Sequence, residues 1–273
     1  MKTALPTRFD FSQSSLQDYL DCPRRFRLRY VEQMPWPAVE AALSKEQESR
    51  QQEGILFHRL IHQHILGIPA VNLIPSGASP DLLRWWGNYM SADLRLDGHT
   101  WRSEVSLFCR VGEHRLVAKY DLIATKDGRA VIYDWKTYMR RPREEWLAAR
   151  WQTRIYSAVL VRAGAILNAG APFHPDDVKM VYWFSEFPRE PAVFNYDGRR
   201  FAADWADIDK LISVISADRS FPLTDDRRMC GACVYRSYCD RGERAAGSSE
   251  TLEVEPSAAA VYAGLEQTEE MAL

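Results

Sequence analysis

Residues 115–137 read RLVAKYDLIATKDGRAVIYDWKT, and this stretch decides the fold. Apolar and polar residues alternate on both sides of Asp127-Gly128, a dipeptide typical of tight hairpin turns. We therefore expect strands over residues 115–125 and 130–136, paired antiparallel. Residues 101–110 alternate in the same way and end near Gly112, so they should add a third strand to an antiparallel meander.

Three polar residues of this stretch form a candidate catalytic site. Residues i and i+2 of a strand point to the same face, so Asp134 and Lys136 should project together, with Trp135 opposite. If the hairpin aligns, Asp121 lies close to both. Two adjacent carboxylates need a cation, which Mg²⁺ or Mn²⁺ supplies through oxygen ligands, and a lysine beside them can orient a water. Alone, Asp-x-Lys is equally consistent with a strand-end salt bridge.

The elements around the meander complete an α/β chain. Val178–Phe184 is an almost wholly apolar run, typical of a strand buried on both faces, and residues 192–196 could pair with it. The core order is then helix, three strands, helix, strand. Apolar residues recur at helical spacing in four further segments, at residues 46–66, 81–96, 142–168 and 201–217.

These motifs resemble the PD-(D/E)xK nuclease superfamily, and within it the RecB-like branch. That pattern has an Asp after a Gly-containing strand, Asp/Glu-x-Lys on the next strand, Gln-x-x-x-Tyr on a following helix, and Gly-x-x-x-His on a helix upstream. The chain has every element in this order: Asp121, Asp134-Trp135-Lys136, Gln152 to Tyr156, and Gly54 to His58. The resemblance covers nearly all of residues 10–240. It departs at Ala118, where the family often has Gly.

The resemblance implies a restriction-endonuclease-like α/β core and a metal-dependent site. Mg²⁺ or Mn²⁺ would be held by four groups, namely the side chains of His58, Asp121 and Asp134 and the carbonyl of Trp135. Lys136 would position the attacking water, and Gln152 and Tyr156 would contact the DNA strand. The implied substrate is single-stranded DNA or a DNA end, often cut by an exonuclease.

The residues alone leave some of these roles open. His58 could be a core histidine bonded to backbone, and Gln152 with Tyr156, which share a helix face, could be a structural polar pair. Glu104, in the middle of the first meander strand, is a weaker candidate for the site. Its alternative is a simple outward-facing residue.

A second group of candidate ligands consists of cysteines. Cys230, Cys233 and Cys239 fall within ten residues, a spacing that suggests a soft metal, and such a site takes a fourth ligand. RecB-like nucleases with iron–sulfur clusters have one Cys-Pro near the N-terminus and Cys-x2-Cys-x5-Cys near the C-terminus, and Cys22-Pro23 fits the first. The resemblance thus implies a 4Fe–4S cluster, with structural zinc or no metal as alternatives. Cys109 is expected to be a buried small hydrophobe.

Composition and charge limit the class of protein, its location and its domain organisation. The chain has 273 residues, 46% of them apolar, and no run of about 20 apolar residues that would span a membrane. Five cysteines are too few for a disulfide scaffold, so a cytoplasmic protein is the default expectation. Residues 245–273 carry six Glu and no Asp, Lys or Arg, so the net charge of −2 becomes +4 for residues 1–244. We expect one nuclease domain over residues 1–244 and an acidic, disordered tail over 245–273.

The sequence therefore predicts a metal-dependent DNA nuclease in repair, recombination or CRISPR-type processing. It contains no Gly-x-x-x-x-Gly-Lys-Ser/Thr loop, so any unwinding would come from a helicase or repair-complex partner. Two alternatives remain. One is a catalytically silent DNA-binding accessory protein of the same fold, and the other is a zinc-stapled interaction module.

Overall fold

The computed structural model describes residues 4–6, 8–35, 45–92, 94, 98–231 and 233–241. The chain divides into two compact units. The first consists of residues 1–9, 14–55 and 214–273, and the second of residues 10–13 and 56–213. The predicted acidic tail and the domain boundary at residue 244 lie outside the described residues. None of the described helices is long and apolar enough to cross a membrane.

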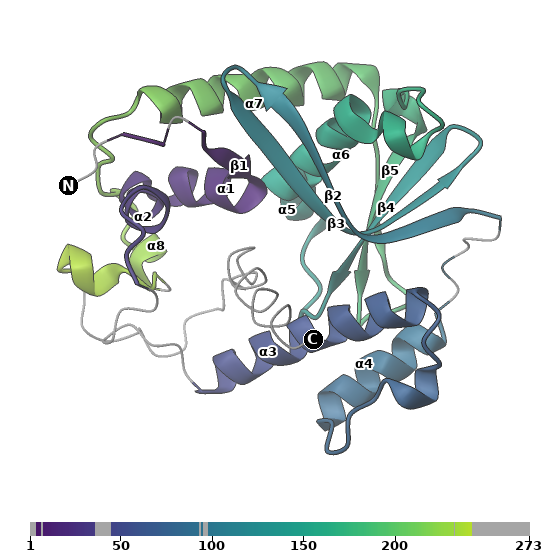
Figure 1. Ribbon diagram of the computed structural model, residues 1–273. Helices are drawn as coiled ribbons and strands as arrows, with labels where there is room; N and C mark the ends of the chain where they lie inside the picture. Colours follow the sequence, from purple (N-terminus) through teal and green to yellow (C-terminus); the bar gives the residue numbers. More distant parts are fainter. Residues whose placement is uncertain are drawn as a thin grey trace, which may run out of the picture. The chain divides into compact units, whose positions relative to one another are not determined.

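The second unit contains a mixed sheet (Figure 1). Its strands are β1 (Asp10–Ser12), β2 (Thr100–Val111), β3 (His114–Lys126), β4 (Arg129–Lys136), β5 (Val178–Phe184) and β6 (Ala192–Asn195). The order is β1-β3-β4-β5-β6, with β2 also paired to β3. The α/β fold class, the antiparallel β2-β3-β4 meander and the β5-β6 pair are confirmed. The parallel pairing of β1 with β3 was not predicted.

The hairpin between β3 and β4 closes where the sequence predicts it. Asp127 and Gly128 both have positive φ, at 49° and 78°, the backbone that a type I′ turn requires. Asn, Asp and Gly tolerate this conformation best, which explains why this dipeptide fixes the register. The register then runs from Lys126–Arg129 to Leu122–Tyr133, so the continuation of both strands brings Asp121 opposite Asp134.

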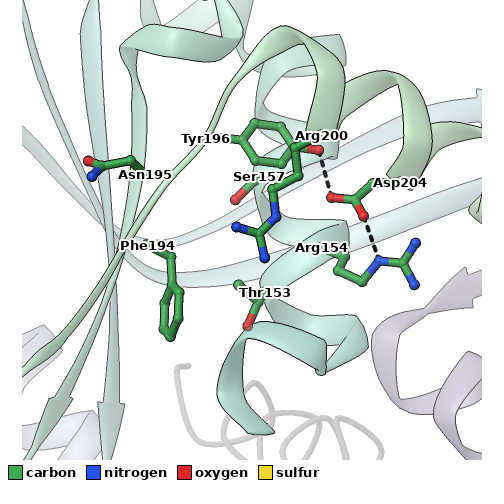
Figure 2. A pocket seen from close by; sticks show the side chains of 8 residues that line it. All are labelled: Thr153, Arg154, Ser157, Phe194, Asn195, Tyr196, Arg200 and Asp204. Atoms are coloured by element: carbon green, nitrogen blue, oxygen red, sulfur yellow. Dashed lines mark hydrogen bonds and ion pairs between the residues drawn. The ribbon is translucent and has the colours of Figure 1, made fainter. Parts of the chain in front are cut away.

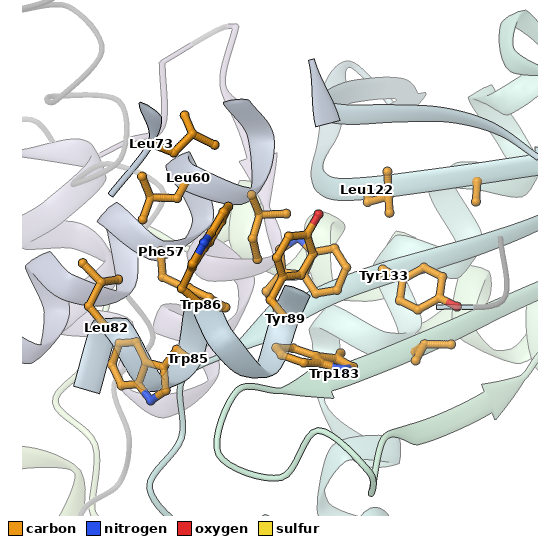
Figure 3. Close-up of a cluster of buried hydrophobic side chains, with 14 residues drawn as sticks. Phe57, Leu60, Leu73, Leu82, Trp85, Trp86, Tyr89, Leu122, Tyr133 and Trp183 are labelled. Carbon is orange, nitrogen blue, oxygen red and sulfur yellow. The ribbon is translucent and has the colours of Figure 1, made fainter. Parts of the chain in front are cut away.

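One face of the sheet is covered by an aromatic cluster (Figure 3). Phe57 comes from α3 (Lys45–Ile65), and Trp85 comes from α4 (Pro80–Met90). Their partners on the sheet include Trp135 and Trp183, and the Phe57 and Trp183 rings stack at 6.4 Å. This packing fixes the helix that carries His58 against the strand that carries the Asp-x-Lys motif. The helix predicted over residues 81–96 ends earlier, at Met90.

The helix predicted over residues 142–168 is interrupted. It consists of α5 (Glu144–Ala149), α6 (Trp151–Ala163) and a 3-10 turn (Gly164–Leu167). Arg150 separates α5 from α6 with an extended ψ of 141°. The Leu147 carbonyl accepts from the Arg150 N–H at 3.2 Å and from the Thr153 hydroxyl at 2.5 Å, so both bonds cap the end of α5. The break places Gln152 in the first turn of α6.

Further elements follow in the two units. The second contains α7 (Gly198–Ala217), which runs on into the first, and 3-10 turns Ala70–Asn72 and Pro175–Asp177. The first contains most of α1 (Gln13–Asp21), α2 (Pro23–Phe26), a π-helical turn (Arg27–Val31), α8 (Arg228–Gly231) and a 3-10 turn (Arg236–Cys239). The stacked rings of Phe26 and Phe221, 5.9 Å apart, join the N-terminal and C-terminal segments of that unit.

Candidate active site

The side chain of Asp121, on β3, bonds to the backbone of β4 just beyond the point where the regular pairing of the two strands ends. The regular β3–β4 pairing ends at Leu122 and Tyr133. The backbone N–H of Trp135 then donates to Oδ2 of Asp121 at 2.9 Å. A carboxylate thus satisfies a strand N–H, and the bond holds Asp121 beside the Asp-x-Lys motif. The sequence did not indicate this bond, because it depends on where the ladder stops.

His58 reaches the same carboxylate from α3. Its Nδ1 lies 3.2 Å from Oδ1 of Asp121. Burial lowers the pKa of His58, but the Asp121 charge and hydrogen bond outweigh it, and the net pKa is raised above 6.5. Burial raises the pKa of Asp121, but the His58 charge and hydrogen bond, with the Trp135 N–H, lower it overall. Without metal, the two groups therefore form a partly buried ion pair.

Asp134, Lys136 and Gln152 form a closed triangle of polar contacts. Nζ of Lys136 lies 2.8 Å from Oδ2 of Asp134, and the Gln152 amide donates to Oδ1 of Asp134 at 2.6 Å. Lys136 in turn donates to Oε1 of Gln152 at 3.1 Å. All three residues are buried. A buried ion pair is costly unless hydrogen bonds complete it, and the Gln152 amide does so on both members.

Tyr156 lies one turn beyond Gln152 and is also buried. Burial, and then the charges of Asp134 and Asp121, raise its pKa well above 10, so it stays a protonated donor. Its backbone carbonyl accepts a 2.9 Å hydrogen bond from the hydroxyl of Tyr120. The predicted DNA contacts of Gln152 and Tyr156 stay a prediction, and they require these buried side chains to become accessible.

Glu104 occupies an unusual position on β2. It falls between the pairs Ser103–Leu122 and Val105–Tyr120, at the register position of Asp121, and its φ of 55° interrupts the ladder there. Its carboxylate lies 2.6 Å from Nζ of Lys119. The structure therefore places Glu104 on the strand next to the site, with its charge engaged by a lysine.

A comparison with known protein families identifies the family of the chain. The family model for the PD-(D/E)XK nuclease superfamily matches residues 10–240. The chain belongs to this superfamily. The fold, the nuclease class and the superfamily expected from the sequence are therefore confirmed, and the family implies DNA as the substrate. Members typically use divalent metal ions such as Mg²⁺.

Solved structures offer more distant likenesses to this PD-(D/E)XK protein. SSO0001 is 16% identical, with a TM-score of 0.38 and 85% of each chain covered. A candidate exonuclease from Eubacterium rectale is 10% identical, with a TM-score of 0.47, covering 75% of this chain and 79% of that one. No curated protein matches the chain.

The opposite face of α6 is anchored to α7 (Figure 2). Arg154 pairs with Asp204 at 2.6 Å and with Asp207, and the hydroxyl of Tyr196 donates to Asp204 at 3.0 Å. These contacts, beside a small pocket, fix the helix that carries Gln152 and Tyr156. They are structural supports of the site rather than part of it.

The four cysteines of the first unit gather around one cavity. Cys22, Cys230, Cys233 and Cys239 line it together with Arg25 and Arg236. Burial, and then the nearby thiols of Cys233 and Cys22, raise the pKa of Cys239 to about 11. In the described part of the chain, no group of three or more His, Cys, Asp or Glu side chains is arranged closely enough to hold a metal ion. Cys109, in β2 of the other unit, is only partly buried.

Asp18 organises the arginines beside this cavity. Its carboxylate accepts from Arg29 at 2.6 Å and from the Tyr30 hydroxyl at 3.1 Å, and it pairs with Arg25 at 2.9 Å. Asp18 lies inside α1, and its pairing with these arginines was not predicted from the sequence. It holds Arg25 next to the cysteine cavity.

Proposed function

We propose that the protein is a metal-dependent deoxyribonuclease of the RecB-like branch, acting as an exonuclease on single-stranded DNA or DNA ends. The observation that carries this proposal is the constellation of two carboxylates and one lysine, of which Asp134 and Lys136 are buried and Asp121 is partly buried. Asp121 is bonded to the backbone between Asp134 and Lys136, which are themselves 2.8 Å apart. A merely structural salt bridge does not require a second carboxylate and a histidine at the same point.

The chemical types of the donors suit a hard divalent ion, although the side chains would have to draw closer together to coordinate one. His58, Asp121, Asp134 and the carbonyl of Trp135 would hold Mg²⁺ or Mn²⁺, which when bound would polarise the phosphate and lower the pKa of a water. Lys136 would orient the attacking water and stabilise negative charge on the phosphate. Gln152 would position the Lys136 ammonium group, because its amide oxygen already accepts from that group. Glu104 stays a weaker candidate.

A cleavage assay with defined ends tests this proposal. The parent protein is incubated with Mg²⁺ or Mn²⁺ and with linear single strands, linear duplex and circular DNA. We expect the protein to degrade the linear single strand only when metal is present, and to leave circular DNA intact. Cutting of the circle would replace the exonuclease assignment by an endonuclease. DNA binding without cleavage under either metal would support the silent accessory protein instead.

We further propose that Cys22, Cys230, Cys233 and Cys239 ligate a 4Fe–4S cluster that staples the two ends of the chain. The four thiols share one cavity, and the cationic side chains of Arg25 and Arg236 also line it, which suits a cluster with four thiolate ligands and net negative charge. Protein purified without air should be brown and contain iron and sulfide. About one zinc and no iron would favour the zinc-stapled module.

The pathway follows from this assignment only as a proposal. We propose that the nuclease acts on strands exposed by a helicase or repair complex, in DNA repair, recombination or CRISPR-type processing. Co-purification with a helicase, tested with an affinity-tagged full chain, would support that setting.

A further inference from the structure

The segment that follows the Asp-x-Lys motif leaves the active site and returns to it. Residues 137–151 begin directly after Lys136 and end directly before Gln152, and these two flanking side chains are bonded at 3.1 Å. The segment contains a loop and the short helix α5. Both ends of this segment therefore lie at the Lys136–Gln152 contact.

The surface of this segment combines an aromatic ring with positive charge. Trp146 is 42% exposed, and the guanidinium of Arg150 lies 4.5 Å from the centroid of its ring. Arg140 and Arg143 are exposed on the loop that precedes it. Four arginines face two glutamates within residues 137–151, so the segment is net positive.

One arginine of the segment has a different role. Arg141 donates to the carboxylate of Glu144 at 2.7 Å and to the carbonyl of Glu190 at 2.9 Å. The contacts of Arg141 therefore stabilise the loop. By contrast, Arg140 and Arg143 are exposed to solvent, and Arg143 precedes Trp146 by three residues.

We propose that Trp146 and Arg150, with Arg140 and Arg143, form a stacking platform that guides a single strand of nucleic acid to Lys136. Flat aromatic and guanidinium faces stack on unpaired bases, and arginines follow the phosphates. Bases of a duplex are already stacked on each other, so the ring discriminates in favour of single strands. This inference rests on the proposed nuclease function, because it supplies that site with its substrate.

Equilibrium binding without divalent metal tests the platform. Chelator prevents cleavage, so fluorescence anisotropy can follow labelled oligo-dT, an RNA of the same length and a blunt duplex. Trp146→Ala should weaken single-strand binding about tenfold, because one base–aromatic stack is lost, and should change duplex binding less than about twofold. Trp146→Phe should restore most of the loss. Trp101→Ala, at an equally exposed tryptophan of β2, is the matched control.

A second variant tests the charges separately. The double variant Arg140→Gln with Arg143→Gln should weaken the binding of both single strand and duplex. For single strands, the slope of log affinity against log salt concentration should fall by about 1.4, at about 0.7 per lost phosphate contact. Parental single-strand affinity in Trp146→Ala, or an equal loss for single strand and duplex, would overturn the platform. Because binding needs no turnover, an inactive parent with intact, tryptophan-dependent binding would refute only the nuclease proposal.

Discussion

Nε2 of Gln152 donates a 2.6 Å hydrogen bond to Oδ1 of Asp134, and both side chains are buried. The oxygen of the same amide accepts from Lys136 at 3.1 Å. One side chain from the start of α6 thus satisfies both charged residues at the end of β4. This contact ties the geometry of the Asp-x-Lys motif to the break at Arg150, because an unbroken helix would place residue 152 differently.

Replacement of Gln152 by Leu should destabilise the fold and the site together. Asp134 and Lys136 would each lose a buried hydrogen-bond partner, so we expect a loss of roughly 1–3 kcal/mol in the free energy of unfolding. Urea unfolding measures it, with Gln52→Leu on the exposed side of α3 as the control. Unchanged stability of Gln152→Leu would show that the two hydrogen bonds of this amide make no net contribution to folding.

Lys136→Ala should separate catalysis from binding. Loss of a group that orients water should lower the cleavage rate by roughly 10²–10⁴-fold. DNA affinity should stay nearly parental, because one lysine is a small share of a phosphate-binding surface. Asp134→Ala should also lose metal-dependent cleavage, yet bind DNA more tightly, since a negative charge facing phosphates is removed. Lys179→Ala, at an exposed lysine of β5, is the control for both assays. A Lys136→Ala protein that still cuts at the parental rate would exclude the assigned role.

The His58–Asp121 pair should make the stability of the metal-free protein depend on pH. The folded pKa of His58 is raised above 6.5, so its contribution is fully present below that pH and is lost as pH rises through the folded pKa. The pKa of Asp121 is lowered, so its contribution is present above about 3.8 and is lost at lower pH. The melting temperature of the parent should therefore exceed that of His58→Ala most in mildly acidic buffer. The same difference at every pH would contradict the ion pair, and His64→Ala provides the control.

The sequence predicted the meander because its determinants are local. Asp127-Gly128 fixes the turn, and two-residue periodicity fixes which side chains project with Asp134. The break at Arg150 could not be read in this way, because the residues around it favour a helix and the Thr153 hydroxyl bond to the Leu147 carbonyl, which accompanies the break, is not visible in the pattern. The parallel pairing of β1 with β3 depends on chain segments about a hundred residues apart.

In the site, too, features set by local motifs were predicted, and features that depend on irregular backbone or on distant residues were not. The resemblance named His58, Asp121, Asp134 and Lys136, and the structure brings all four together. It gave no indication that Gln152 would be buried between charges. Glu104 was uncertain from the sequence because its position depends on a positive φ that interrupts a strand, a conformation not encoded by strand periodicity.

Cys22→Ser should cost stability more than it alters the carboxylate site. Cys22 and Cys230 are 208 positions apart, and closing such a loop costs roughly 5 kcal/mol of chain entropy, which a cluster offsets. We expect a lower melting temperature and loss of the brown colour, with metal binding to Asp121 and Asp134 retained at low temperature. Cys109 lies outside the group of four cysteines, so Cys109→Ser is the control and should keep the colour and melting temperature of the parent. Equal melting of Cys22→Ser and the parent would refute the staple.

Truncation after Gly247 should raise DNA affinity at low salt. The removed residues carry six glutamates, while residues 1–244 carry +4, so the tail either repels DNA or competes for the basic surface. Screening acts over about 8 Å at physiological ionic strength, so the gain should shrink as salt rises. Every proposed ligand precedes Arg241, so iron content and cleavage at saturating DNA should not change.

The informative comparison is a salt series rather than a single affinity. A truncated protein that binds DNA more tightly at low salt and equally at high salt would establish an electrostatic role for the six glutamates. A second variant, with the six glutamates changed to glutamine in the full-length chain, distinguishes charge from bulk, because it keeps the length of the tail. If truncation weakens folding while this variant does not, residues beyond 247 belong to the folded domain, and the boundary at residue 244 is wrong. If neither variant changes DNA affinity, the acidic segment has no electrostatic influence on the substrate, and binding to a protein partner becomes the role to test.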